Sequence, residues 1–386
     1  MEETIRLLLG AVRSAMWGRA LPAASAPEIW KDVYTLAQTN DLAFLVYEGA
    51  VRGNATLPEE VSKRFLRSAG AAFGRFCAQN HAMERLSDAF EQAQIDYLPL
   101  KGLVLRDLYP TAEWRVGRDL DILIRPADLN RACAALRQAL APVTEKKATH
   151  DVAFETPDGV RLELHFSLFD DVDRCGTLLS HPFAHAFPCV SGGHRYRLPD
   201  AELYAYQIAH MAKHLRYGGG CGIRPFLDLF LLSEQIGQAA REKGETLLSV
   251  CDLEGFARVV HHASTVFFGD GDEDAKTDAL LRFILKNQAF GTYQSAAALQ
   301  KSDADTATDD RSHLLSRLFP SYRYMCRSYP VLRRAPVLLP FCWGVRGLHI
   351  FAGPSRTRFL EENRAYRTVG QEHIDEMSRM LDYLQL

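Results

Sequence analysis

The chain has 386 residues, of which 47% are hydrophobic and 24% are charged, as in globular proteins with two or three packed units. The formal net charge of −3 argues against a surface that coats nucleic acid. The eight cysteines are scattered and include no Cys-x-x-Cys pair, so they indicate neither a disulfide framework nor a cysteine zinc site.

The composition predicts a cytoplasmic protein without a transmembrane segment. The first residues, Met1 to Thr4, do not have the basic-then-apolar order of a signal peptide. The longest apolar run, residues 335–345, is interrupted by Pro336 and Pro340. It is well short of the ~20 residues needed to cross a bilayer.

Helical periodicity dominates residues 1–94, and strands and helices alternate over residues 95–190. The turn Thr156-Pro-Asp-Gly159 indicates a hairpin, because Gly accepts a positive φ and Asp bonds its own backbone. The elements predicted in the second region are a strand at 95–100, a short helix at 103–109, a strand through 119–124, a helix over 129–140 and two strands at 150–155 and 160–166.

Asp119 and Asp121 are two residues apart at the start of the apolar run Ile122-Leu-Ile124. On a strand, such residues project from the same face, so both carboxylates would enter shared space. Two adjacent anions are usually tolerated because a divalent cation, Mg²⁺ in particular, binds between them. The alternative is an ordinary solvated strand end.

A third carboxylate is predicted beside this pair. In Arg161-Leu-Glu-Leu-His-Phe166, Glu163 and His165 alternate with leucines and therefore share one face of the hairpin's second strand. Three carboxylates on neighbouring strands fit a two-metal phosphoryl-transfer site. His165 is expected to be a hydrogen-bond partner of the site rather than a metal ligand.

The order Lys101-Gly102, Arg115, Asp119-x-Asp121 and Glu163-x-His165 resembles the uncharacterised bacterial branch of the nucleotidyltransferase superfamily. Relatives of that branch include the aminoglycoside nucleotidyltransferases and DNA polymerase beta. The resemblance covers roughly the middle two thirds of the chain. It implies that Asp119, Asp121 and Glu163 hold Mg²⁺ or Mn²⁺, with an NTP such as ATP as co-substrate. Where most of the superfamily has Gly-Ser or Gly-Gly, this branch has Lys-Gly, and a lysine can meet a phosphate as a point charge.

A helix predicted over residues 201–217 carries a second group of polar residues. Its apolar stripe is Tyr204, Ile208, Met211 and Leu215, and His210, Lys213 and His214 lie on the adjoining side. The resemblance favours a role for Lys213 and His214 in binding the nucleotide. The alternatives are ordinary helix-flank residues or a zinc site, although Met211 replaces the glutamate of His-Glu-x-x-His.

Arg224 and Asp228 are one helical turn apart and are expected to form a structural ion pair. Asp228 is alternatively a candidate for orienting the acceptor.

Residues 311–360 contain nine arginines and no acidic residue, with tyrosines, phenylalanines and a tryptophan among them. Such a segment could bind an acidic partner or the headgroup zone of a membrane. It could equally fold back onto acidic loops predicted at 270–274 and 303–310, or be a solvated face.

These observations predict an α+β fold with a small mixed-sheet nucleotidyltransferase core flanked by N-terminal and C-terminal helical regions. The predicted parts are an N-terminal helical region at 1–94, the α/β core at 95–190, a helical domain roofing the cleft at 191–310, and the arginine-rich helical segment at 311–386.

The predicted function is metal-dependent transfer of a nucleoside monophosphate from an NTP to an unknown acceptor hydroxyl, with release of pyrophosphate. Lys101, Gly102, Arg115 and Arg118 would bind the nucleotide phosphates, because cationic side chains pair well with phosphate oxygens. Two alternatives remain. One is a nucleotide-binding scaffold without catalysis, and the other is an interaction protein that acts through its arginine-rich C-terminal segment.

Overall fold

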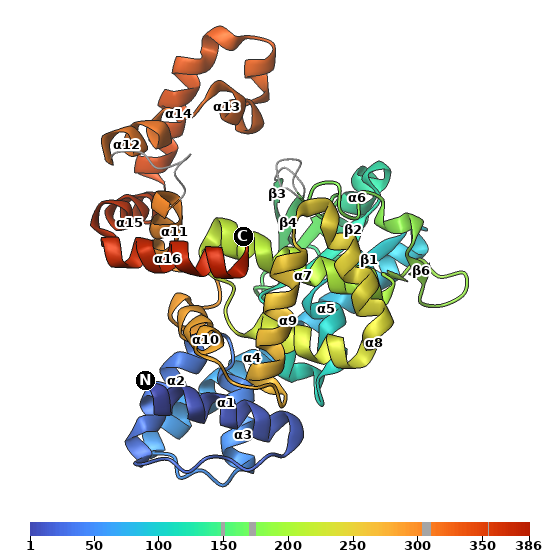
Figure 1. Ribbon diagram of the computed structural model, residues 1–386. Coiled ribbons are helices and arrows are strands. Elements are labelled where there is room, and N and C mark those ends of the chain that lie inside the picture. Colours follow the sequence, from blue (N-terminus) through green and yellow to red (C-terminus); the bar gives the residue numbers. More distant parts are fainter. Residues whose placement is uncertain (148–150, 170–174, 303–309, 354) are drawn as a thin grey trace. The chain divides into compact units, whose positions relative to one another are not determined.

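The computed structural model describes residues 1–386 except 148–150, 170–174, 303–309 and 354 (Figure 1). The described chain forms two compact units. Unit 1 consists of Met1–Ala212 and Gly222–Ala289, and unit 2 of Lys213–Cys221 and Phe290–Leu386. The four-part division drawn from composition is a different partition and stays a prediction.

The N-terminal part of unit 1 is helical. Its helices are α1 (Glu2–Trp17), α2 (Trp30–Thr39), α3 (Ala43–Arg52) and α4 (Glu59–Gln92). α1 packs against α3 with the two backbones in close approach, since a Cβ added to Gly49 would lie only 1.7 Å from the Ala11 carbonyl oxygen. α4 is long enough to contact α2 and α3 with its first half and the sheet core with Met83, Leu86 and Phe90 in its second half.

A five-stranded mixed sheet follows, in the order β1-β2-β5-β4-β3. Among the strand pairs that the structure describes in this sheet, β2–β5 is the parallel one. The strands are β1 (Tyr97–Pro99), β2 (Asp119–Ile124), β3 (Thr144–Lys147), β4 (Asp151–Glu155) and β5 (Arg161–His165).

One face of this sheet forms the core of the α/β region. Leu120, Ile122 and Ile124 of β2 are buried there with Leu162 and Leu164 of β5, under α4 and α6 (Leu129–Ala139). Alternation along each strand turns the intervening residues of β2 and β5 to the opposite face. The prediction of an α+β fold with a small mixed sheet and flanking helices is confirmed.

Most predicted elements of this region are present with shifted ends. The short helix predicted at 103–109 is α5 (Gly102–Leu105) followed by a 3-10 turn, Arg106–Leu108. The predicted hairpin is β4–β5, with Gly159 at φ 79° in its turn, and His150 lies outside the described residues. A small two-stranded ladder, β6 (Phe187–Pro188) with β7 (Tyr196–Arg197), completes the region.

Helices make up the remainder of both units. α7 (Asp200–Gly218) begins in unit 1 and ends in unit 2. The later helices of unit 1 are α8 (Arg224–Leu248), α9 (Glu254–Phe268) and α10 (Ala275–Asn287). Those of unit 2 are α11 (Tyr293–Ser302), α12 (Asp310–Leu318), α13 (Tyr322–Ser328), α14 (Leu339–Ala352), α15 (Ser355–Thr368) and α16 (Gln371–Leu384).

The predicted acidic loop at 270–274 is a loop that ends at Asp274, the N-cap of α10, whereas most of the loop predicted at 303–310 falls outside the described residues. All eight cysteines have free thiols. In the described part of the chain, no helix combines the length and apolarity needed to cross a membrane.

Candidate active site

Asp119 and Asp121 lie at the start of β2, on the face of the sheet opposite the core. The parallel ladder between β2 and β5 places Asp121 directly opposite Glu163, and Leu123 directly opposite His165. Residues opposite one another on adjacent strands project from the same face, so the sheet itself brings these side chains together.

Asp121 is the centre of the contacts in this group. Its carboxylate is 3% exposed, and its Oδ1 accepts a hydrogen bond from Lys101 Nζ at 2.7 Å and contacts His165 Nε2 at 2.8 Å. Burial by itself raises the pKa of the Asp121 carboxyl, but the Lys101 ammonium and the His165 imidazole together hold that pKa below its ordinary value. Asp121 is therefore a buried anion at neutral pH.

The surroundings of Asp119 shift the pKa of its carboxyl in the opposite direction. Burial and the neighbouring Asp121 carboxylate raise the pKa of Asp119 to about 6, with Lys101 opposing the shift. The site thus contains more carboxylates than nearby cations can fully compensate, which is the situation that a bound divalent cation relieves.

Asp121, Glu163 and His165 each offer a ligand atom, and these three atoms all lie within 4.8 Å of one another. Carboxylate oxygens and an imidazole nitrogen are suitable donors for a divalent cation, so the residues present fit such an ion. Glu163 also accepts two hydrogen bonds from Arg161 through Oε1, at 2.9 and 2.6 Å. Among the described residues, Asp121, Glu163 and His165 are the one group of at least three potential metal ligands that lie close together. Neither His210 nor His214 belongs to this group.

Lys101 reaches Asp121 because of an unusual turn after β1. Its backbone has φ 48° and ψ −122°, in a region that non-glycine residues seldom occupy. Burial lowers the pKa of the Lys101 ammonium, but Asp121 more than offsets this and the pKa lies above its usual value. Lys101 is therefore a permanent cation among the carboxylates.

Arg115 is fixed on the other side of this turn by a buried carboxylate. Its Nε and Nη2 donate to the two oxygens of Asp228 at 2.7 Å each, and Tyr109 Oη donates to Asp228 Oδ1 at 2.8 Å. The remaining amino group, Nη1, faces Gly102, where an added Cβ would lie 3.2 Å from it. Glycine at position 102 therefore lets the guanidinium approach the turn closely.

The same contacts revise the predicted ion pair between Arg224 and Asp228. Asp228 is fully buried and bonds Arg115 and Tyr109. Arg224 instead donates to the Val116 carbonyl at 2.8 Å and to the Asp41 carbonyl. Asp228 has a structural role, as expected, but with Arg115 as its partner.

Comparison with known proteins agrees with this geometry. The model of a family described as "Uncharacterised nucleotidyltransferase" matches residues 26–267, which is more than half of the chain and includes every residue of the carboxylate group. The chain belongs to this nucleotidyltransferase family. No curated protein matches the sequence.

Three further nucleotide contacts were predicted for this member of the family, at Arg118, Lys213 and His214. Arg118 is exposed and pairs with Asp41 at 3.2 Å. Lys213 and His214 are in unit 2, the second unit described above, and their contact with the nucleotide stays a prediction.

α7 contributes a residue that the sequence did not single out. Tyr206 is buried, with its ring 6.0 Å from the ring of His210 and 5.8 Å from that of Phe169. Burial raises the pKa of the Tyr206 hydroxyl, Lys101 opposes that shift, and Asp121 and Asp119 add to it. Tyr206 is thus a side chain of α7 that interacts electrostatically with Lys101 and the carboxylates. Its position four residues before His210 was the available signal in the sequence.

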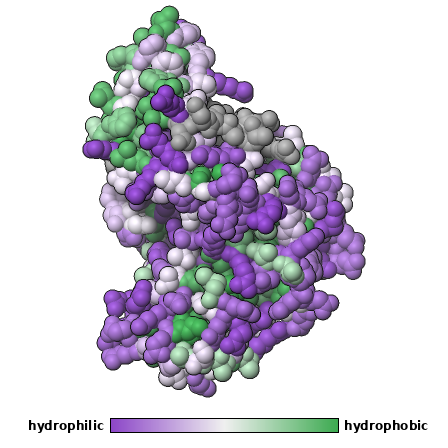
Figure 2. All heavy atoms as spheres, turned by 60° about the vertical axis from the view of Figure 1, so that its left-hand side comes forward, coloured by the Kyte–Doolittle hydropathy of each residue, from purple (hydrophilic) through white to green (hydrophobic). Residues whose placement is uncertain are grey.

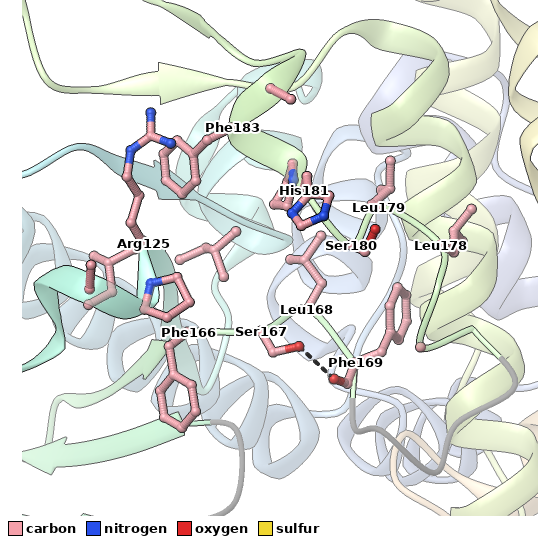
Figure 3. Close-up of a pocket in the computed structure, with 17 residues that line it drawn as sticks. Arg125, Phe166, Ser167, Leu168, Phe169, Leu178, Leu179, Ser180, His181 and Phe183 are labelled. Atoms are coloured by element: carbon pink, nitrogen blue, oxygen red, sulfur yellow. Dashed lines mark hydrogen bonds between the residues drawn. The ribbon is translucent and has the colours of Figure 1, made fainter.

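A cavity of about 520 Å³ opens at the far end of β2 (Figure 3). It begins at Leu123, the next residue after Asp121 on the same face of the strand, and extends to the segment 176–184. Figure 3 shows Leu168, Leu179 and Phe183 among its lining side chains, with Arg125 at one side. Arg125 is held by Asp96, to which its Nη2 donates at 3.0 Å, and it lies 4.5 Å from the Phe183 ring centroid. The lining is mostly apolar and includes the polar residues Arg125, Ser167, Ser180 and His181.

Proposed function

We propose that this nucleotidyltransferase transfers a nucleoside monophosphate from an NTP to a hydroxyl group of an acceptor. The acceptor oxygen forms a bond to the α-phosphorus, and the bond from that phosphorus to the bridging oxygen of the β-phosphate breaks. Pyrophosphate leaves, and the hydroxyl proton passes to solvent water. The observation that carries the proposal is the group of Asp121, Glu163 and His165 beside Asp119, on two paired strands of a nucleotidyltransferase-family chain.

Asp119, Asp121 and Glu163 would hold the metal ions in this proposal. When bound, Mg²⁺ or Mn²⁺ would supply positive charge to the triphosphate and to the attacking and leaving oxygens. Asp121 is oriented for this task by His165, whose Nε2 contacts its Oδ1 at 2.8 Å. The parallel ladder holds Glu163 opposite Asp121, so the spacing of the carboxylates is set by rigid backbone.

Lys101, Gly102 and Arg115 would meet the nucleotide phosphates. The turn at Lys101-Gly102 carries the lysine ammonium on one side and lies against Arg115 Nη1 on the other. Asp228 and Tyr109 fix the guanidinium, so little side-chain entropy is lost when Nη1 binds an anion. Arg118, Lys213 and His214 are further proposed contacts of the nucleotide.

The test is titration of each of the four NTPs into the full chain, with Mg²⁺ and with a chelator, followed by measurement of pyrophosphate release. We expect Mg²⁺-dependent binding that Glu163→Gln weakens at least about tenfold, as for removal of a charged ligand group. Glu155→Gln is the matched control, because Glu155 is an exposed carboxylate at the end of the same hairpin. Equal loss of binding in both variants, or none in either, would contradict the site.

A second candidate function follows from Lys101. Its ammonium already bonds the central carboxylate, so it could stand in for a metal ion in a nucleotide-binding protein without turnover. Such a protein would bind NTP in the presence of a chelator and release no pyrophosphate. The Lys101→Met variant would then lose NTP binding with or without Mg²⁺.

The acceptor of the proposed reaction would place its apolar part in the cavity beside Leu123. The cavity starts at Leu123, which is two residues beyond Asp121 and projects from the same face of β2. Two residues of a strand span roughly 7 Å. Ala184 is an exposed residue of the lining, so Ala184→Trp would fill space without disturbing the core. We expect this variant to bind Mg²⁺ and NTP normally while raising the KM for an apolar hydroxylated acceptor.

A further inference from the structure

Unit 2 contains a small helical subdomain with a very limited core. It consists of α13, the 3-10 turns Pro330–Arg333 and Pro336–Leu338, and α14, which contact one another. Its buried cluster is formed by Met325, Cys326, Leu332 and Cys342. Much of the apolar surface of these elements is consequently left outside the core.

The exposed apolar residues fall on one side of α14 and the turn before it. Val337 is 85% exposed, Phe341 70%, Leu348 68% and Phe351 48%. Positions 337, 341, 344, 348 and 351 are spaced by four, three, four and three residues, which places them on one helical face. We call these five residues the α14 face. Cys342 and Ile350, on the other side, are the buried residues of α14.

Figure 2 shows hydrophobic side chains gathered at the upper end of the view, where Figure 1 places α13 and α14. Exposed aromatic residues of the preceding elements, Phe319 at 51% and Tyr324 at 46%, belong to the same subdomain surface. A contiguous apolar surface of this kind marks an interaction site, since isolated exposed apolar residues are the usual pattern.

Positive charge predominates in the segment that contains the α14 face. The segment 311–360 has nine arginines and no acidic residue. Arg323 is exposed on α13, and Arg333 and Arg334 are exposed at the end of the turn that packs on α13. Arg346 lies on the buried side of α14, between Cys342 and Ile350, with its guanidinium 5.5 Å from the Tyr324 ring. The partner must therefore be both apolar and anionic over a wide area.

A second copy of the chain does not satisfy this requirement. A symmetric dimer would bring the α14 face against itself and its arginines against arginines, and like charges in contact are unfavourable. Nucleic acid supplies phosphates and stacking faces, but it has no apolar phase to cover Val337 and Leu348. A bilayer that contains anionic lipids offers both an acyl region and a negative surface.

The length of α14 determines how the helix would be oriented on a membrane. Its 14 residues span about 21 Å, less than the roughly 30 Å hydrocarbon core of a bilayer. The helix would therefore lie parallel to the membrane surface, with its apolar face in the acyl boundary and the arginines at the phosphates.

From these observations we propose that the α14 face, with Arg323, Arg333 and Arg334, docks the protein peripherally on an anionic lipid surface. The membrane contact is made by the exposed apolar side of α14. The buried side keeps its packing on the subdomain core, so docking needs no unfolding. This role is independent of nucleotidyl transfer.

The test is co-sedimentation of the full, nuclease-treated chain with vesicles of phosphatidylcholine alone or mixed with phosphatidylglycerol. We expect sedimentation with the mixed vesicles that falls as salt is raised, and little with phosphatidylcholine alone. The double variant Phe341→Ser/Leu348→Ser should lower the partition coefficient at least about tenfold. Arg333→Gln/Arg334→Gln should lower it by roughly 25-fold, at about fivefold per basic residue.

Two matched double variants on α4 serve as controls. Leu66→Ser/Phe73→Ser removes a leucine and a phenylalanine that are 52% and 50% exposed, and Arg75→Gln/Arg85→Gln removes two exposed arginines. Both should sediment like the unaltered chain. Circular dichroism of all four variants checks that they are folded.

Three outcomes would overturn the proposal. In the first, the unaltered chain stays in the supernatant with anionic vesicles. In the second, the α14 and α4 variants sediment alike. In the third, the chain without vesicles is a dimer that Phe341→Ser/Leu348→Ser converts to monomers, which would assign the face to a second copy.

Discussion

At the scale of single residues, Asp121 is the side chain that makes the most contacts at the site. It is 3% exposed, bonds Lys101 and His165 through one oxygen, and lies opposite Glu163. If both aspartates lay at a solvated strand end, neutralising them would cost little stability. Burial of Asp121 with a lysine changes that expectation, because an ion pair taken out of water is costly to break from one side.

The first prediction is that Asp121→Asn destabilises the fold by about 3–5 kcal/mol, because it leaves the Lys101 ammonium without its anion. Adding Lys101→Met to that variant should restore most of the loss, since both charges are then absent. Urea unfolding of the two single variants and the double variant measures this coupling. Additive effects of the two substitutions would show that the pair contributes nothing to stability.

The second prediction concerns pH and Asp119. Its folded-state pKa of about 6 is above the ordinary value of 3.8, so the protonated form is favoured by folding. The stability it contributes is present below about pH 4 and is lost as the pH rises through about 6. Asp119→Asn removes this loss, so its unfolding free energy relative to the unaltered chain should rise over that interval.

Urea unfolding of both proteins at several pH values, in a chelator, measures the Asp119 effect. Adding Mg²⁺ should reduce the difference near neutral pH if the carboxylate is a ligand, since a bound cation favours the ionised form. A difference that is constant with pH would mean that Asp119 titrates normally.

At the scale of elements, the sequence predicts the helices and strands that are determined by residues close together in the chain. Alternation of leucines with Glu163 and His165, and the turn before them, predicts β5 correctly. β3 was missed because Thr144–Lys147 reads Thr-Glu-Lys-Lys, the charged composition of a protected edge strand. The bond from Arg115 to Asp228 spans 113 residues, so neither this pairing nor the role of Tyr109 could be read from spacing.

The third prediction belongs to the packing of α1 on α3. Gly49→Ala would place a Cβ 1.7 Å from the Ala11 carbonyl oxygen, so the two helices must separate. We expect a loss of at least about 3 kcal/mol of unfolding free energy. Gly70→Ala in α4 is the control, because nothing lies within 4 Å of its added Cβ. Glycine is costly inside a helix, so Gly70→Ala should gain about 0.5–1 kcal/mol. Similar effects of the two changes in urea unfolding would contradict the close approach of α1 and α3.

At the scale of the whole molecule, the sheet region of unit 1 and the α13–α14 subdomain of unit 2 have buried clusters of very different size. The sheet core of unit 1 buries nineteen side chains in one cluster, while the α13–α14 cluster of unit 2 buries four. Local opening is easiest where few apolar contacts must be broken, so stability should be uneven along the chain.

The fourth prediction is that backbone amides of α14 exchange with deuterium much earlier than those of β2 and β5. Mass-spectrometric hydrogen exchange of the full chain provides the measurement. α4, which packs along the sheet core, serves as an internal reference for slow exchange in a helix. Equal protection of α14 and α4 would show that the α13–α14 subdomain is stabilised by more than its own small cluster.

The position of Lys101 also has a kinetic consequence. Because its ammonium bonds Asp121 Oδ1, the protein places its own cation at the central carboxylate, so a free metal ion meets less uncompensated negative charge there. A cation arriving alone would have to displace the lysine from this bond without offering it a new anion. A cation that arrives with a triphosphate brings the lysine a new partner, so the exchange is favourable. We therefore expect an ordered addition in which the metal–nucleotide complex binds as one species, and in which free Mg²⁺ by itself binds weakly.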